Sequence, residues 1–166
     1  MSPLDPDTLS RLLDRHGPAL VLYARQWCAT PEDVVQEAFV RLVAEGVPPR
    51  DPVGWLYRVV RNGAINAVRA AGRRTRREAA VASRGEPWFH ASPDDRLDAA
   101  AATEALADLP IHERETIVAR LWGGLAFDEI AQLTGSSAST VHRWYQRGLE
   151  ALRERLGAAC RPTKNP

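Results

Sequence analysis

The chain has 166 residues, enough for one domain or two small domains with a real hydrophobic core. Its 22 basic and 21 acidic side chains leave a net charge of only +1, and 45% of its residues are hydrophobic, as in globular proteins. The longest apolar run is too short for a membrane span, no secretory leader is apparent, and two isolated cysteines argue against a disulfide framework, so we expect a cytoplasmic protein.

The first part of the chain predicts two helices with clear starting signals. Asp5 followed by Pro6 is typical of a helix start, and apolar residues then recur on one side. Gly17-Pro18 predicts an interruption, after which the helical pattern resumes over 19–27. Thr30-Pro31, followed by two acidic residues, predicts the start of a second helix that ends at Gly46.

A third helix is expected to begin at Asp51-Pro52 and to run into a dense arginine tract. Seven arginines fall within twenty residues, without an acidic residue among them: Arg58, Arg61, Arg69, Arg73, Arg74, Arg76 and Arg77. The following stretch, 78–108, is instead rich in acidic residues. A basic stripe beside an acidic connector is more typical of a nucleic-acid-binding protein than of a generic enzyme.

Residues 81–97 lose the helical periodicity and are expected to form a flexible acidic linker, although Trp88-Phe89 within it should bury against something. A second helical unit is expected from about Asp98 to Leu109, with a restart at Pro110. Alanine, leucine and arginine dominate the chain and β-branched runs are scarce, so the predicted fold class is all-α. We expect two spatially separate helical domains.

The last third of the chain, 125–156, has the pattern of a helix-turn-helix, which presents a helix to the major groove of DNA. Gly135 is expected to end its first helix, and Ser136 or Ser137 to cap the second. Val141, Tyr145, Leu149 and Leu152 would be buried, which leaves the polar positions between them facing outward. Such side chains can reach phosphates and base edges, although an ordinary helical hairpin with a solvated face has the same pattern.

Two segments separately resemble one family, the sigma-70 family of bacterial RNA polymerase sigma factors. EDVVQEAFVRLVAE with DPVGWLYRVVRNGAINAVRAAGRR is similar to sigma domain 2, and the segment from LADLPIHERE to LEALRERL is similar to sigma domain 4. The two resemblances span roughly residues 4–156 in the order of the compact extracytoplasmic-function (ECF) class. The resemblance implies domain 2 over 1–80, a linker over 81–97 and domain 4 over 98–160.

The resemblance implies three binding surfaces and no catalytic residue, metal ligand or cofactor. The helix from Pro31 to Glu45 would dock on the β′ clamp helices of core polymerase through Asp33, Gln36, Glu37, Phe39 and Leu42. The next helix would recognise and melt the −10 promoter element through Trp55, Arg58, Arg61, Asn62, Asn66, Arg69, Arg73 and Arg74. The second helix of the helix-turn-helix would read the −35 element through Ser137, Ser139, Thr140, His142, Arg143 and Arg147.

The same family pattern implies further partners and three departures from the usual sequence. The β flap of polymerase and an anti-sigma factor are expected partners, and the linker would thread toward the polymerase channels. Ala126 replaces a common capping residue, and Gly148 replaces the usual alanine. Trp144 is also unusual, and we expect it to pack on DNA or against a bound partner.

Two other classes of function remain open from the residues alone. The chain could be a free-standing helix-turn-helix regulator, which would bind a palindrome as a symmetric dimer without polymerase. An enzyme that cleaves or recombines DNA would need a carboxylate cluster or an activated nucleophile. The four histidines are dispersed and no glycine-rich phosphate loop is present, so the sequence argues against this class.

Overall fold

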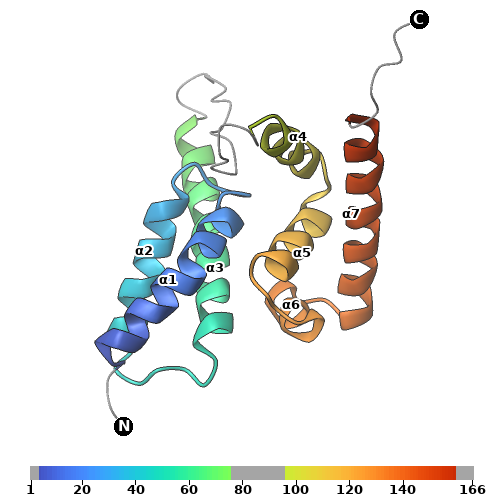
Figure 1. Ribbon diagram of the computed structural model, residues 1–166. Coiled ribbons are helices and arrows are strands. Elements are labelled where there is room, and N and C mark those ends of the chain that lie inside the picture. The colour runs from blue at the N-terminus through green and yellow to red at the C-terminus, as the bar shows by residue number, and fades with distance from the viewer. Residues whose placement is uncertain (1–3, 76–95, 160–166) are drawn as a thin grey trace, which may run out of the picture.

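The computed structural model describes residues 4–75 and 96–159, and over these ranges the chain is helical, as predicted (Figure 1). Most of the predicted linker, including Trp88-Phe89-His90, lies outside the described residues. The helices are α1 (Pro6–Ala24), α2 (Pro31–Ala44), α3 (Pro52–Thr75), α4 (Arg96–Ala107), α5 (Ile111–Leu121), α6 (Phe127–Thr134) and α7 (Ala138–Ala159). They form two units, α1–α3 and α4–α7, in line with the predicted architecture.

The N-terminal unit is a bundle in which α1, α2 and α3 each contact the other two. Its helices begin where the sequence predicts, with Thr30 before α2 and Asp51 before α3. The Asp51 carboxylate accepts a hydrogen bond from the backbone N–H of Gly54 at 3.0 Å, which satisfies one of the unpaired donors at the start of α3. The apolar faces of the three helices meet in a common core.

The predicted interruption of the first helix at Gly17-Pro18 is wrong, because α1 continues through both residues to Ala24. Proline inside a helix removes one backbone hydrogen bond and costs about 3 kcal/mol. Pro18 itself is exposed, but Gly17 before it and apolar residues beyond it, such as Leu20 and Tyr23, are buried against the rest of the protein. Burial of this apolar surface offsets the local cost, and sequence periodicity alone does not reveal it.

In the C-terminal unit α7 packs against α4, α5 and α6, and the structure explains one unusual residue (Figure 1). Gly148 of α7 is buried, and a Cβ atom added there would lie 2.5 Å from Cδ1 of Ile117 on α5. A larger residue would therefore require Ile117 to move. Ile117 itself is fully buried with Leu106 and Leu109, so the glycine permits close packing of α5 on α7.

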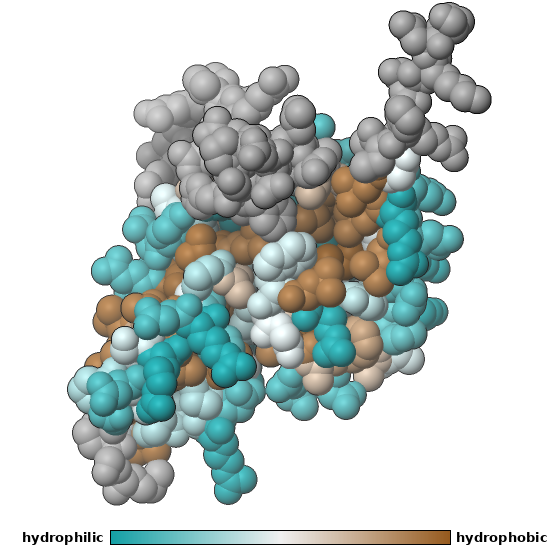
Figure 2. Space-filling model, in the orientation of Figure 1, coloured by the Kyte–Doolittle hydropathy of each residue, from teal (hydrophilic) through white to brown (hydrophobic). Residues whose placement is uncertain are grey.

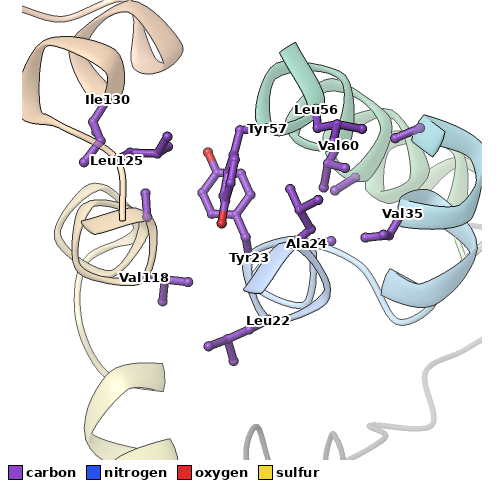
Figure 3. Packing of buried hydrophobic residues seen from close by; sticks show 14 of the residues in the cluster. Leu22, Tyr23, Ala24, Val35, Leu56, Tyr57, Val60, Val118, Leu125 and Ile130 are labelled. Atoms are coloured by element: carbon purple, nitrogen blue, oxygen red, sulfur yellow. The ribbon is translucent and has the colours of Figure 1, made fainter. Parts of the chain in front are cut away.

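The two units are not spatially separate, contrary to our expectation. α1 contacts α5 and α3 contacts α6, and one hydrophobic core runs across the junction. Figure 3 shows Tyr23 and Tyr57 of the N-terminal unit lying between that unit's core and Val118, Leu125 and Ile130 of the C-terminal unit. All five side chains are at most 3% exposed. Within the part of the chain that the structure describes, each unit thus carries an apolar patch that the other unit covers.

A buried carboxylate lies at this junction. The side chain of Glu115 on α5 is 1% exposed and accepts hydrogen bonds from Tyr23 Oη at 2.5 Å and Arg61 Nε at 2.6 Å. Arg61 Nη2 lies 3.5 Å from the second carboxylate oxygen, so the guanidinium engages both oxygens. Burial and the negative charge of Glu115 raise the pKa of Tyr23 well above its usual value. Burial alone would lower the pKa of Arg61, but the hydrogen bond to Glu115, the negative charge of Glu115 and the contact with Tyr23 together outweigh burial and raise it.

Among the arginines of the tract whose burial the structure describes, all but Arg61 are exposed. Arg58, Arg69 and Arg73 are exposed along α3, whereas the side chain of Arg61 is only 21% exposed. The Arg74 side chain and Arg76 and Arg77 lie outside the described residues. The junction therefore withdraws one arginine of α3 from solvent and leaves at least three available.

Replacing either junction tyrosine by phenylalanine should change the free energy of unfolding, but in opposite directions. The Tyr57 hydroxyl is buried and has no hydrogen-bond partner among the described residues, whereas the Tyr23 hydroxyl donates to Glu115. Tyr57→Phe should raise the free energy of unfolding by about 1 kcal/mol, and Tyr23→Phe should lower it by about 1–3 kcal/mol. Urea unfolding of both variants measures this, and two shifts of the same sign would contradict the hydrogen-bond assignment.

Candidate nucleic-acid interface

The helix-turn-helix predicted from the sequence is present as α6, a tight turn and α7. Gly135 ends α6 in the left-handed conformation with φ of 70°, where glycine carries no steric cost. The backbone N–H of Ser136 then donates to the Ala131 carbonyl at 3.0 Å. Of the two proposed caps, Ser137 fills the position, because its Oγ accepts the Thr140 N–H at 3.2 Å.

The start of α6 shows how the chain compensates for an alanine where a capping residue is common. Ala126 has no side-chain oxygen to bond the first backbone donors of the helix. The Glu129 carboxylate instead reaches back and accepts the Ala126 N–H at 2.6 Å, which is half of a capping box. Arg120 also donates to the Leu125 carbonyl at 2.9 Å and so braces the preceding turn.

The outward face of α7 carries the side chains that the sequence assigned to DNA recognition, and the outer edge of this helix is hydrophilic in Figure 2. Ser137, Ser139, His142, Arg143 and Arg147 are exposed, and Thr140 is partly exposed. Val141 on the opposite face is fully buried. The burial pattern of α7 therefore separates a packing face from an accessible polar face.

Phe127 organises the side chains at the start of the helix-turn-helix. Its ring meets His142 edge-on at a centroid distance of 5.2 Å and Tyr145 at 5.3 Å. The Arg120 guanidinium lies over the same ring at 4.9 Å from its centroid. Exposed His142 is thus held against a fixed aromatic surface, a support that the sequence reasoning missed because it comes from a different helix.

Trp144 makes a contact within the chain that the sequence did not predict. Its ring stacks on His112 of α5 with centroids 4.7 Å apart and an interplanar angle of 11°. We expected Trp144 to pack on DNA or a bound partner. The side chain instead joins α7 to α5, which gives this unusual residue a role in packing.

The second group of predicted contacts follows α3. Arg58, Asn62, Asn66, Arg69 and Arg73 are exposed, whereas Trp55 is only partly buried and packs against the core. Arg61 turns toward the junction, where it pairs with Glu115 and lies 5.9 Å from the centre of the Trp27 ring. The structure therefore brings the predicted arginines and asparagines onto one helix, with Arg61 engaged elsewhere.

The predicted polymerase-binding set on α2 divides into exposed and buried members. Asp33, Gln36 and Glu37 are exposed, but Phe39 and Leu42 are only 7% and 1% exposed and belong to the core. Two residues that the sequence reasoning missed, Val40 and Val43, are 57% and 53% exposed on the same helix. The sequence did contain a signal for this exposed apolar surface, because both valines lie outside the apolar stripe that the amphipathic helix buries.

A groove runs between the polar faces of α2 and α3. It has a volume of about 320 Å³ and is lined by Asp33, Val34, Glu37, Arg41, Val59, Asn62, Gly63 and Asn66. Arg41 pairs with Glu37 at 3.0 Å along α2. The groove connects the two surfaces to which the sequence assigned different partners.

Neither metal coordination nor a membrane span is indicated by residues 4–75 and 96–159. Within these ranges no group of three or more histidine, cysteine, aspartate or glutamate side chains could hold a metal ion. None of the described helices is both long and apolar enough to cross a membrane. An exposed polar α7 in a helix-turn-helix, joined to a second unit with a cationic α3, is the arrangement of a DNA-binding protein.

Comparison with known proteins identifies the family. Residues 12–74 match Sigma-70 region 2, and residues 99–152 match Sigma-70, region 4. The RNA polymerase sigma factor CarQ of Myxococcus xanthus is 31% identical over 161 residues, covering 91% of this chain and 90% of that protein. The ECF RNA polymerase sigma factor SigD of Mycobacterium bovis is 29% identical, covering 93% and 80%, respectively.

Two solved structures share the fold across both units. The sigma factor RpoE in complex with the anti-sigma factor NepR from Bartonella quintana has a TM-score of 0.75 and 23% identity, covering 92% of this chain and 98% of that chain. CnrH in complex with the cytosolic domain of CnrY has a TM-score of 0.64 and 25% identity, covering 93% and 90%. The chain belongs to the ECF class of sigma-70 family RNA polymerase sigma factors. It is a promoter-directing factor, and factors of this kind are non-enzymatic.

The cap of α7 gives a prediction about the stability of the helix-turn-helix. Ser137→Ala should lower the free energy of unfolding by about 1 kcal/mol, because the Thr140 N–H loses its acceptor. The matched control is Ser139→Ala, which removes a hydroxyl bonded only to that of Ser137 and should change stability by less than about 0.5 kcal/mol. Thermal or urea unfolding checks both, and equal losses would argue against the cap.

Proposed function

We propose that the exposed faces of α2, α3 and α7 divide the work of promoter recognition in this sigma factor. α2 would bind the β′ clamp helices of core polymerase, α3 would bind and melt the −10 element, and α7 would read the −35 element. The main support is that α3 and α7 each expose cationic and hydrogen-bonding side chains while their other faces are buried. Residues 1–80 and 98–160 would be the corresponding functional domains.

On α2, the proposed polymerase contact combines an acidic rim with a small apolar centre. Asp33, Gln36 and Glu37 supply the rim, and exposed Val40 and Val43 supply the centre. An apolar centre with a polar rim is the usual composition of a specific protein interface. Phe39 and Leu42 would then contribute indirectly, since they hold α2 in place from within the core.

The double variant Val40→Asp and Val43→Asp should weaken binding to core polymerase at least about tenfold, because it places charge at the centre of the contact. Its free energy of unfolding should change by less than about 0.5 kcal/mol, since both side chains are largely exposed. Fluorescence anisotropy with purified core enzyme measures the binding. Leu13→Asp on α1, where Leu13 is 48% exposed, is the control, and equal losses in both proteins would contradict the α2 surface.

The proposed DNA contacts on α3 and α7 differ in kind. Arg58, Arg69 and Arg73 would hold phosphates of the −10 region, while Asn62 and Asn66 would bond unstacked bases, with Trp55 at the edge. On α7, Arg143 and Arg147 can bond phosphates or guanine, and Ser137, Ser139, Thr140 and His142 can reach other base edges. The arginine tract would include Arg74, whose side chain lies outside the described residues.

The salt dependence of promoter binding can distinguish direct phosphate contacts of the α7 arginines from a general effect of the protein's positive charge. Arg143→Ala and Arg147→Ala should each reduce the slope of log affinity against log salt concentration by about 1, because each removes one cation from the DNA face. The measurement uses holoenzyme and a duplex that carries a mapped promoter. Arg155→Ala is the control on the same helix, since Arg155 pairs with Asp108 at 2.6 Å. If Arg155→Ala reduced the slope by the same amount, the effect would come from the overall charge of the protein, and Arg143 and Arg147 would not be assigned to the DNA contact.

We further propose that the protein acts in the cytoplasm and that an anti-sigma factor regulates it. The support is that one of the solved structures described above is a complex of a sigma factor, RpoE, with the anti-sigma factor NepR. The C-terminal unit would also contact the β flap of polymerase. Purification of the chain from its native cells should bring the β and β′ subunits or a small inhibitor with it.

Transcription in vitro tests the proposed function as a whole. Core polymerase with this chain and a pool of genomic promoters should initiate at new start sites preceded by shared −10 and −35 sequences. Core polymerase alone provides the background. If no start site depends on the chain, or if the chain alone binds a palindrome tightly as a dimer, the regulator alternative would replace this proposal.

A further inference from the structure

One aromatic side chain connects the first helix of the helix-turn-helix with the exposed face of the second. Phe127, the first residue of α6, is half-buried and packs against the hydrophobic core. Its ring centroid lies 5.2 Å from that of His142 on α7, and the two ring planes are 81° apart. Tyr145, one turn further along α7, meets the same ring at 5.3 Å. Phe127 therefore contacts side chains on two successive turns of α7.

Phe127 is itself held in place by residues outside α7. The Arg120 guanidinium lies 4.9 Å from the centre of the Phe127 ring, where a cation is attracted to the aromatic face. Arg120 also donates to the Leu125 carbonyl at 2.9 Å, two residues before the ring. The Glu129 carboxylate accepts the Ala126 N–H at 2.6 Å and fixes the start of α6. The ring thus has a defined position before any DNA is bound.

This position restricts His142, which belongs to the set proposed for the −35 element. An exposed side chain ordinarily samples several rotamers, whereas an edge-on contact with a fixed ring favours those that keep the two rings together. A neutral imidazole has one donor and one acceptor nitrogen, so the base edge that it can bond depends on how the ring is turned. A ring oriented in advance also loses less conformational entropy on binding.

We propose that Phe127 is a positioning residue for promoter recognition, which orients His142 so that it prefers one base pair of the −35 element. Arg120 supports this role because it fixes the Phe127 ring from the other side. The inference rests on the proposed reading of the −35 element by α7. It makes specificity a property of both helices of the helix-turn-helix, although only α7 would contact the bases.

Base preference at each position of the −35 element tests the proposal. Holoenzyme is bound to a mapped promoter and to versions in which each −35 base pair is replaced in turn. His142→Ala should lower the preference at one base pair about fivefold or more, because a side-chain contact to a base is lost. Phe127→Leu should lower the preference at the same base pair about threefold or more. It should have no further effect in the presence of His142→Ala, because both changes act through one side chain.

Two further variants separate positioning from packing. Phe127→Tyr keeps the aromatic ring and should retain most of the preference. Trp144→Leu is the matched control, because it removes another ring contact of α7, which lies on His112 and not on His142. It should leave the preference at the His142 base pair unchanged. An equal loss in Trp144→Leu would show that general packing of α7 explains the effect, and would overturn the positioning role.

Proton NMR of the free full-length chain tests the aromatic contact without polymerase or promoter. The ring current of Phe127 should displace the imidazole proton signals of His142 from those of an exposed histidine. His142→Ala identifies these signals among the four histidines of the chain by their loss. The displacement should vanish in Phe127→Leu and persist in Phe127→Tyr. Signals that Phe127→Leu leaves unchanged would overturn the proposal.

Circular dichroism verifies that Phe127→Leu keeps its helices. If this variant does not fold, Arg120→Met serves instead, since it removes the cation from the Phe127 ring, and it should lower the same preference by a smaller factor. If His142→Ala changes no base preference, the proposed reading role of His142 is refuted and the positioning role falls with it. If His142→Ala changes a preference that Phe127→Leu retains, only the positioning role is refuted.

Discussion

The buried Glu115 carboxylate is the constraint around which the two halves of this protein are arranged. A buried ionised group is unfavourable unless each of its oxygens is paired, and its hydrogen bonds here come from Tyr23 and Arg61 in the other unit. The surrounding apolar side chains supply the attraction between the units. The ion pair contributes little net stability but fixes their register, because only one placement of α5 against α1 and α3 satisfies it.

α2 and α7 each combine a buried face that packs in the core with an exposed face that is available for binding. A residue of these helices therefore cannot be assigned to packing or to binding from its helix alone. α2 buries Phe39 and Leu42 and exposes Val40 and Val43. α7 buries Val141, stacks Trp144 on His112, and leaves Arg143 and Arg147 in solvent. A rigid inner face keeps the outer side chains in place for binding, and small adjustments such as Gly148 let the helices approach closely enough to do so.

The packing of the two units against each other partly buries one arginine of α3. The protein's family membership defines promoter direction as the function, and the fold it shares with the solved structures of RpoE and CnrH covers both units. Arg58, Arg69 and Arg73 of α3 are exposed, whereas the side chain of Arg61 is only 21% exposed.

The sequence by itself determined the local features: the helix starts at Pro6, Pro31 and Pro52, the left-handed turn at Gly135, and the all-α class. It also predicted the exposed face of α7 and the burial of Val141, because caps, glycines and periodicity act within a few residues. The other three predicted core positions, Tyr145, Leu149 and Leu152, are only partly buried. Only the tertiary structure decided that α1 continues through Pro18 and that Trp144 packs on His112. It alone also placed Arg61 against Glu115, which lies 54 residues away. These outcomes depend on burial between distant segments, where the free energy of covering apolar surface and pairing a buried charge outweighs local preference.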